Sequence, residues 1–242
     1  MAETVDAVCE LVRSGERGWL CTVNVATLMA MRRQPPLREH VEGARIVVAD
    51  GQPLVWCSTL FGARLPERVA GIDLIDALCR RACADGLGIF LLGSTAPLMK
   101  NTLRLLRERH PGLRVDGADG YFSNAERKER LARIRTSGAT ILMVGMGSPL
   151  QERFIADNWQ RLGVNVAIGV GGSFDVLGGA LRRAPQWLQD AGLEWLARAA
   201  QEPRRLLPRY LRSNTEFCLL IAREIVRRWV RRLARGSTRE MA

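Results

Sequence analysis

Histidine is scarce in this chain. Among 242 residues there are two histidines, His40 and His110, and none of the six cysteines belongs to a Cys-x-x-Cys pair. Structural zinc sites and histidine-based catalytic triads need such residues in clusters. We therefore expect no metal site and no cofactor, and we interpret the cysteines as reduced, mostly buried thiols of a cytoplasmic protein.

Long apolar runs are also absent. The sequence has no stretch of about 18 uncharged apolar residues, so we expect no membrane-spanning helix. Residues 1–10 contain acidic groups and no basic start before an apolar block, so we expect no secretory signal. A chain of 242 residues is long enough for one large α/β domain, with or without an appendage.

Basic charge is concentrated at one end of the chain. The net charge is +11, and residues 198–242 supply +8 of it through twelve arginines, four glutamates and no lysine. In segment 219–233, apolar residues and arginines alternate at helical spacing, whereas Pro203 and Pro208 are expected to interrupt the helix before it. Such a helix either lies on an anionic membrane or docks on its own domain with a solvated basic face.

Apolar strands and helices alternate along residues 1–195. Strands are expected at 19–25, 45–49, 88–93, 141–144 and 166–170, and helices at 5–13, 26–33, 74–84, 98–109 and 125–135. Parallel strands buried on both faces are typically continuous apolar runs. The pattern predicts an α/β fold with a doubly wound, mostly parallel, Rossmann-like sheet and helices on both faces, followed by a basic helical appendage at 196–242.

Two glycine turns follow the last two expected strands. Gly145 and Gly147 follow the first of these strands, and Gly171 and Gly172 follow the second. Glycines there let backbone N–H groups approach a phosphate at the start of the next helix. Both turns lack the third glycine of the dinucleotide motif, which favours one nucleotide diphosphate over NAD, although glycine turns also close ordinary βα units.

Polar side chains lie beside these turns and at another strand end. Asp50 directly follows strand 45–49, at the sheet edge where open α/β sheets place their sites, although Asp-Gly is also a common turn pair. Gln151 and Asp175 stand near expected helix starts, where they either hold a nucleotide or stabilise the helix. Ser94 or Thr95 is expected to cap the helix after strand 88–93, with phosphate contact as the alternative for Ser94.

These residues form ten blocks that resemble the WecG/TagA/CpsF glycosyltransferases, also called glycosyltransferase family 26. The blocks, in order, are TVN at 22–24, ADG at 49–51, ERVAG at 67–71, FLLG at 90–93, GYF at 120–122, VGMGxPxQE at 144–152, GVGGxFD at 169–175, RAP at 183–185, LEW at 193–195 and EPR at 202–204. Their order along nearly the whole chain makes the resemblance specific.

The resemblance implies an inverting, metal-independent transfer from a UDP-sugar to a sugar on a polyprenyl diphosphate lipid, in bacterial surface polysaccharide or cell-wall polymer biosynthesis. N-acetylmannosamine, its uronic acid and glucose are all compatible donor sugars. The resemblance also implies that the C-terminal appendage brings the enzyme to the cytoplasmic face of the cell membrane and completes the site. It leaves homo-oligomerisation open.

The family motifs imply a role for each matching residue. Asp50 is expected to be the general base, and Thr22 and Asn24 to orient the donor sugar or the acceptor. On the UDP-sugar side, the expected residues are Arg68, Tyr121, Gly145, Gly147, Gln151, Gly171, Gly172 and Asp175. Contacts to the lipid diphosphate or the UDP phosphates are expected from Arg198, Arg205 and Arg209, for which attraction to anionic lipid is the alternative.

Two other functions are compatible with parts of the sequence. A nucleotide-dependent oxidoreductase or sugar-nucleotide epimerase would share the alternating α/β pattern, but the dinucleotide motif is incomplete. A nucleic-acid-binding protein would share the basic charge. However, most of that charge lies in an amphipathic tail with few aromatic residues for base stacking, so we expect a membrane partner and no nucleic acid.

Overall fold

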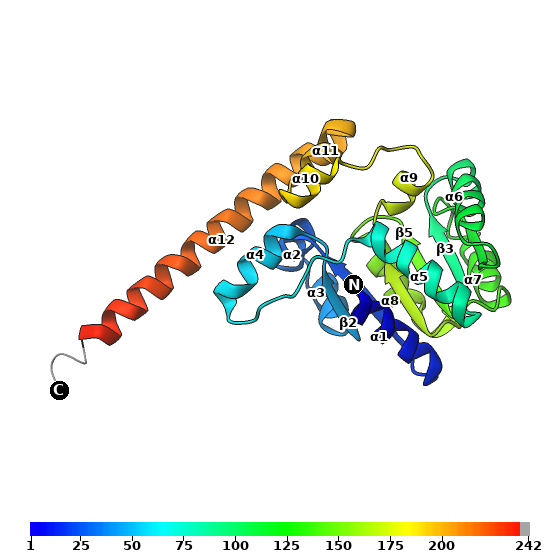
Figure 1. Ribbon diagram of the computed structural model, residues 1–242, viewed down its shortest axis with the longest axis horizontal. Coiled ribbons are helices and arrows are strands. Elements are labelled where there is room, and N and C mark those ends of the chain that lie inside the picture. Colours follow the sequence, from blue (N-terminus) through cyan, green and yellow to red (C-terminus); the bar gives the residue numbers. More distant parts are fainter. Residues whose placement is uncertain (238–242) are drawn as a thin grey trace.

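Six parallel strands form a single sheet in the order β2-β1-β6-β5-β3-β4 (Figure 1). The computed structural model describes the backbone of residues 1–237 and the side chains of residues 1–229. The strands are β1 (Gly18–Val23), β2 (Ile46–Ala49), β3 (Gly88–Gly93), β4 (Arg114–Ala118), β5 (Ile141–Gly145) and β6 (Val166–Gly169). The predicted α/β, Rossmann-like arrangement is therefore confirmed.

Helices surround the sheet and continue beyond it. They are α1 (Ala2–Arg13), α2 (Val25–Met31), α3 (Pro35–Glu42), α4 (Gln52–Ser58), the short 3-10 helix η1 (Thr59–Phe61), α5 (Gly71–Asp85), α6 (Ala96–Arg109), α7 (Arg127–Thr136), α8 (Leu150–Leu162), α9 (Ser173–Leu177), α10 (Gln186–Asp190), α11 (Glu194–Gln201) and α12 (Pro203–Ser237). Among the described residues, none of these helices is long and apolar enough to cross a membrane.

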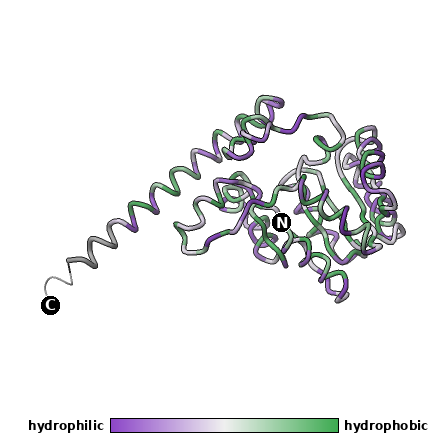
Figure 2. The backbone as a smooth tube through the Cα atoms, in the orientation of Figure 1, coloured by the Kyte–Doolittle hydropathy of each residue, from purple (hydrophilic) through white to green (hydrophobic). Residues whose placement is uncertain are grey.

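Side chains of the central strands alternate between two apolar cores. In β3, Ile89 and Leu91 pack with residues of α1, α5 and α6, whereas Phe90 and Leu92 pack with residues of α7 and α8. Both faces are thus covered by helices, which explains why these strands are continuous apolar runs in the sequence. Figure 2 shows the resulting concentration of hydrophobic backbone positions within the sheet.

The strand order brings several strand ends together at one edge. The chain passes from β1 outward to β2, then from β3 outward to β4 on the other side, and returns through β5 and β6 to fill the middle. This order differs from the 3-2-1-4-5-6 order of the dinucleotide-binding fold. In open parallel sheets, a reversal of winding opens a crevice at the carboxyl ends of the strands, and here the connections that follow the neighbouring strands β5 and β3 run in opposite directions.

Local contacts explain two differences from the sequence-based expectations. β1 ends at Val23 instead of residue 25, because Asn24 caps α2 and its Oδ1 accepts a hydrogen bond from the Thr27 N–H at 3.0 Å. Of the two residues predicted to cap α6, Thr95 holds the N-cap position and Ser94 does not. Thr95 occupies the N-cap without a side-chain hydrogen bond, while Ser94 adopts a left-handed φ of 55° and donates to Asp175.

The prediction that Pro203 and Pro208 interrupt the C-terminal helix is confirmed for Pro203, which follows the break between α11 and α12, and is wrong for Pro208, which lies within the continuous α12. Pro203 stands at its first position, where its missing N–H costs nothing, and Pro208 lies inside it. Packing compensates for Pro208: Phe217 is buried against residues of α2, and Glu216 forms an ion pair with Arg33. In Figure 1, α12 projects well beyond the sheet, and hydrophobic and hydrophilic positions alternate along it in Figure 2.

Part of the predicted amphipathic pattern lies outside the described side chains, namely Val230, Arg231, Arg232 and Leu233.

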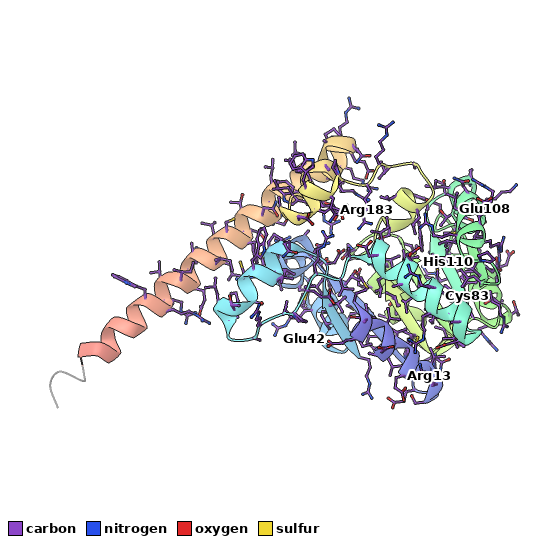
Figure 3. All side chains as sticks on the ribbon, viewed as in Figure 1. Arg13, Glu42, Cys83, Glu108, His110 and Arg183 are labelled. Carbon is purple, nitrogen blue, oxygen red and sulfur yellow. The ribbon has the colours of Figure 1, made fainter. Side chains whose placement is uncertain are left out.

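Cys83 and His110 lie on the side of the molecule far from α12 (Figure 3). His110 contacts Asp76 at 3.1 Å, and the Cys83 thiol donates to the carbonyl of Pro111 at 3.2 Å. These contacts tie α5 to the end of α6.

Candidate active site

A cavity of about 890 Å³ opens at the carboxyl ends of β1, β2, β5 and β6, and residues of α11 and α12 line its opposite side. Every residue that the sequence indicates for the site lines this one cavity: Thr22, Asn24, Asp50, Arg68, Tyr121, Gly145, Gly147, Gln151, Gly171, Gly172, Asp175, Arg198, Arg205 and Arg209. Segments from residue 22 to residue 209 therefore meet in a single volume.

Asp50 lies where β2 ends, next to the end of β1, and its backbone N–H donates to the Val23 carbonyl at 2.8 Å. Within the described part of the chain, no hydrogen bond joins the Asp50 side chain to another residue. Burial, followed by the negative charge of Glu194, raises the pKa of Asp50 to about 7, and the nearby Arg68 and Arg198 partly oppose this rise. An unpaired carboxylate with a pKa near neutrality is suited to general base catalysis.

Arg68 does not point freely into the cavity. Its Nη1 donates to Glu194 Oε2 at 2.8 Å, and its Nη2 makes a longer contact of 3.5 Å with Gln189 Oε1. The Arg68 side chain is 15% exposed and that of Glu194 is 26% exposed. The expected donor-side arginine is thus already engaged with an acidic residue on α11.

Thr22 and Asn24 flank the end of β1, and each is fixed by the backbone. The Thr22 hydroxyl donates to the Gly169 carbonyl of β6 at 2.8 Å. The Asn24 carbonyl oxygen accepts from both the N–H and the hydroxyl of Thr27, so its amide nitrogen is the group left to face a ligand. Both side chains are therefore held in one orientation at the cavity wall.

The glycines of the two turns serve different purposes. Gly147 and Gly171 have left-handed φ angles of 78° and 58°, with nothing within 4 Å of an added Cβ. These two positions give the turns their shape and leave the backbone open to the cavity. At Gly145 a Cβ would lie 2.4 Å from the buried Phe174 ring, so packing requires glycine there, whereas at Gly172 it would lie 2.5 Å from Arg198 Nη2, the movable end of a long side chain.

Gln151 connects the two glycine turns. It is buried at the start of α8, where its Oε1 accepts from the Gly171 N–H at 2.9 Å and its Nε2 donates to Glu152 Oε1 at 3.0 Å. Burial raises the pKa of Glu152, whose Oε2 has no hydrogen-bond partner among the described residues. Gln151 thus fixes the backbone of the second turn through this hydrogen bond, and a ligand would contact that backbone and not the buried Gln151 side chain.

Asp175 and Tyr121 lie on the remaining walls. Asp175 Oδ1 accepts a hydrogen bond from the Ser94 hydroxyl at 2.9 Å, which leaves Oδ2 as an acceptor for a ligand. Tyr121 is 75% exposed and lines the cavity from the loop after β4. Its exposure places the aromatic ring at the opening instead of in the floor.

Three arginines reach the cavity from the C-terminal helices. Arg198 of α11 lies against Gly172, and its Nη1 is 3.4 Å from the Gly172 carbonyl. Arg205 and Arg209 of α12 line the same cavity, and Arg205 also pairs with Glu202 at 2.7 Å. Guanidinium groups at this position can bind phosphate oxygens through paired hydrogen bonds.

A family model described as "Glycosyl transferase WecG/TagA/CpsF family" matches residues 1–231. The chain belongs to this family. As a WecG/TagA/CpsF glycosyltransferase, it acts in cell-surface polysaccharide biosynthesis and uses a sugar donor and an acceptor. An oxidoreductase, an epimerase or a non-catalytic nucleic-acid-binding protein does not fit this membership.

Sequence reasoning missed several residues of this glycosyltransferase site. Ser94 was predicted to be a cap or a phosphate contact but not a partner of Asp175, and Glu194 was only part of the LEW block. Tyr210 of α12 lines the cavity with its ring edge-to-face against Trp195. Glu194 and Arg68 are 126 positions apart in the sequence, and Ser94 and Asp175 are 81 positions apart. The block motifs marked the segments, but no local pattern could indicate these pairings.

Proposed function

We propose that this glycosyltransferase transfers a sugar from a UDP-sugar to a polyprenyl-diphosphate-linked acceptor, with inversion and without a metal ion. The observation that supports this most strongly is the Asp50 carboxylate, which has no hydrogen-bond partner among the described residues and faces a cavity that also receives Arg198, Arg205 and Arg209 from the C-terminal helices. One proton acceptor and several phosphate-binding cations are the two requirements of such a transfer.

In the proposed reaction, the acceptor hydroxyl attacks the anomeric carbon from the face opposite UDP. The new C–O bond forms as the bond to the UDP oxygen breaks, and that oxygen leaves with the electron pair. Asp50 accepts the hydroxyl proton, while Thr22 and Asn24 orient the sugar groups. Arg198, Arg205 and Arg209 stabilise the developing negative charge on the diphosphate.

The glycine turns serve the donor in this proposal. Gly147 presents its backbone N–H to the UDP phosphates, whereas the Gly171 N–H is donated to Gln151 Oε1, so Gly171 serves the donor by shaping its turn. Asp175 and Tyr121 contact the nucleoside side. Gly145, which packs against Phe174, and Gln151, which accepts a hydrogen bond from Gly171, act on the donor by fixing the shape of the two turns, and Gly172 leaves room for Arg198.

We further propose that residues 196–242 form an appendage that binds the inner face of the cell membrane, next to residues 1–195 as the α/β domain. On α12, Ile225, Val226 and Trp229 are exposed, and Arg223 and Arg227 lie among them. Exposed apolar side chains flanked by arginines favour an anionic bilayer. Such contact would bring the polyprenyl acceptor to the cavity from the membrane.

A donor screen tests the proposed activity. Full-length enzyme is incubated with a panel of UDP-sugars and a short-chain lipid-diphosphate acceptor, and the anomeric configuration of the product is determined by NMR. We expect one UDP-sugar to react in the presence of EDTA, to give an inverted product and to require Asp50. Turnover with the Asp50→Asn variant at the rate of the unmodified enzyme would refute the base assignment.

Thermal shift measurements test the nucleotide class separately. UDP should raise the melting temperature of the enzyme, because a ligand that binds only the folded state stabilises it. Stabilisation by NAD and not by UDP would refute the proposed donor. Asp50→Asn should respond to UDP as the unmodified chain does, since its carboxylate is assigned to the acceptor.

A further inference from the structure

Arg68 lies beside Asp50 but is bound elsewhere. The Val69 N–H donates to the Ala49 carbonyl at 2.8 Å, and this hydrogen bond brings the residues next to Val69 and Ala49, namely Arg68 and Asp50, close together. A guanidinium near a carboxylate commonly forms a strong paired contact. Here Arg68 instead donates to Glu194 at 2.8 Å and contacts Gln189 at 3.5 Å.

The partners of Arg68 are themselves fixed. Gln189 is buried, and its Nε2 donates to the Ala184 carbonyl at 2.7 Å, so its Oε1 is directed toward Arg68. Glu194 is the first residue of α11, where the helix dipole favours a negative charge. The Glu194–Arg68 pair is partly buried, so solvent screens it less than a surface ion pair.

The second cation near Asp50 is also held by another group. Arg198, one turn after Glu194 on α11, lies against Gly172, and a Cβ at that glycine would be 2.5 Å from Arg198 Nη2. Its Nη1 is 3.4 Å from the Gly172 carbonyl. As a result, neither arginine forms a hydrogen bond with the Asp50 carboxylate in the described structure.

We propose that Glu194 is a positioning residue that holds Arg68 away from Asp50 and so keeps the Asp50 carboxylate free to accept a proton. This inference rests on the proposed function, in which Asp50 is the general base. A carboxylate paired with an arginine is a weaker base, because the pair stabilises its ionised form. Glu194 therefore acts through Arg68, and it need not touch either substrate.

The other charged groups around Asp50 are consistent with this role. Glu194 and Arg198 face it from α11, Arg68 from the segment before α5, Asp73 from α5, and Tyr210 from α12. Asp73 is paired with Arg183 at 2.6 Å. After burial, the charge of Glu194 is the largest influence that raises the pKa of Asp50, and the charge of Arg68 is the largest that lowers it.

Carboxyl titration in the full chain tests the proposal without requiring transferase activity. The Asp50 carboxyl carbon is followed by ¹³C NMR in protein with labelled aspartate, and the Asp50→Asn variant assigns its signal. We expect a midpoint near pH 7 in the unmodified chain. In Glu194→Gln and Glu194→Ala the midpoint should fall by about one unit or more, as expected when an arginine pairs with a carboxylate.

A matched control and a double variant separate positioning from a general loss of charge. Asp190→Asn removes a negative charge from an exposed residue on neighbouring α10, whose side chain contacts Gln186, and should leave the Asp50 midpoint unchanged. In an Arg68→Gln background, the shift caused by Glu194→Ala should become smaller, because the cation that Glu194 restrains is then absent.

Activity gives a second readout. In the Glu194 variants the acidic limb of the kcat/KM profile should move to lower pH together with the NMR midpoint, and the rate at pH 8 should fall because the base is weaker. An Asp50 midpoint that is the same in Glu194→Ala as in the unmodified, folded chain would overturn the proposal. A shifted midpoint in an enzyme that transfers no sugar would support the positioning role and refute the proposed function.

Discussion

Asp50 is a side chain whose ionisation opposes folding. Because its pKa is raised to about 7 in the folded chain, its contribution to stability is fully present below about pH 4 and is lost as the pH rises through 7. We predict that Asp50→Asn, which stays neutral, is more stable than the unmodified chain at pH 8, on the order of a few kcal/mol. It should lose turnover by roughly a hundredfold or more.

Thermal unfolding at pH 8 and pH 5 checks this prediction, and the stability advantage of Asp50→Asn should shrink at pH 5. An advantage of equal size at both values would mean that ionisation of Asp50 is not its source. The comparison needs no substrate.

His40 has the opposite dependence on pH. It is stacked on Trp19, neither ring nitrogen has a partner among the described residues, and burial lowers its pKa to about 4. Since the unfolded pKa is about 6.5, the contribution of the neutral ring is complete above pH 6.5 and is lost as the pH falls toward 4. We predict that lowering the pH from 7.5 to 4.5 reduces the free energy of unfolding of His40→Phe by roughly 2 kcal/mol less than that of the unmodified chain. Urea unfolding at the two pH values measures this difference. Parallel losses in the two proteins would contradict this.

Helices and strands differ in how well the sequence predicts them. Five of the six strands were predicted from apolar runs, because burial on both faces leaves little choice of residue type in central strands such as Ile141–Gly145, whereas the edge strand β4 (Arg114–Ala118) was not predicted. The prediction for α12 failed because it weighed the local cost of Pro208 and had no information on the packing of Phe217 against α2. Tertiary contacts, which local patterns do not contain, decided the continuity of this helix.

Phe217 is therefore a test of how α12 is held. It is buried against Val25 and Met29, and its truncation in Phe217→Ala should cost about 3–5 kcal/mol of docking energy. We predict faster cleavage within α12 in limited proteolysis and a lower transfer rate, whereas Leu219→Ala, at an exposed position of the same helix, should behave as the unmodified chain. Unchanged cleavage of Phe217→Ala would show that other contacts suffice.

Across the molecule, the sequence identified the segments of the site but not their pairings. All fourteen predicted residues line one cavity because the strand order brings their segments to one edge. The partners of Arg68 and Asp175 come from distant segments whose approach depends on the whole fold. Motifs record which residues are present, whereas the hydrogen bonds between them follow from three-dimensional geometry.

Membrane contact can be tested on the intact chain. We predict that Trp229→Ala weakens co-sedimentation with anionic vesicles several-fold and that deletion of residues 219–242 abolishes it, with binding by the unmodified chain decreasing as salt increases. Trp229 is 62% exposed at the outer part of α12. Trp187→Ala, at an exposed tryptophan on α10, serves as the control. Equal pelleting of the deleted and full chains would rule out α12 as the membrane contact.

The continuity of α12 through Pro208 fixes a length. Tyr210 lines the cavity, and Trp229 lies further along the same unbroken helix, at a separation of about 28 Å from the helical rise per residue. If Trp229 lies at the level of the lipid headgroups, the tilt of this helix sets the height of the cavity above the bilayer. The geometry of this one helix then sets how far from the bilayer the lipid diphosphate must lie to reach the cavity.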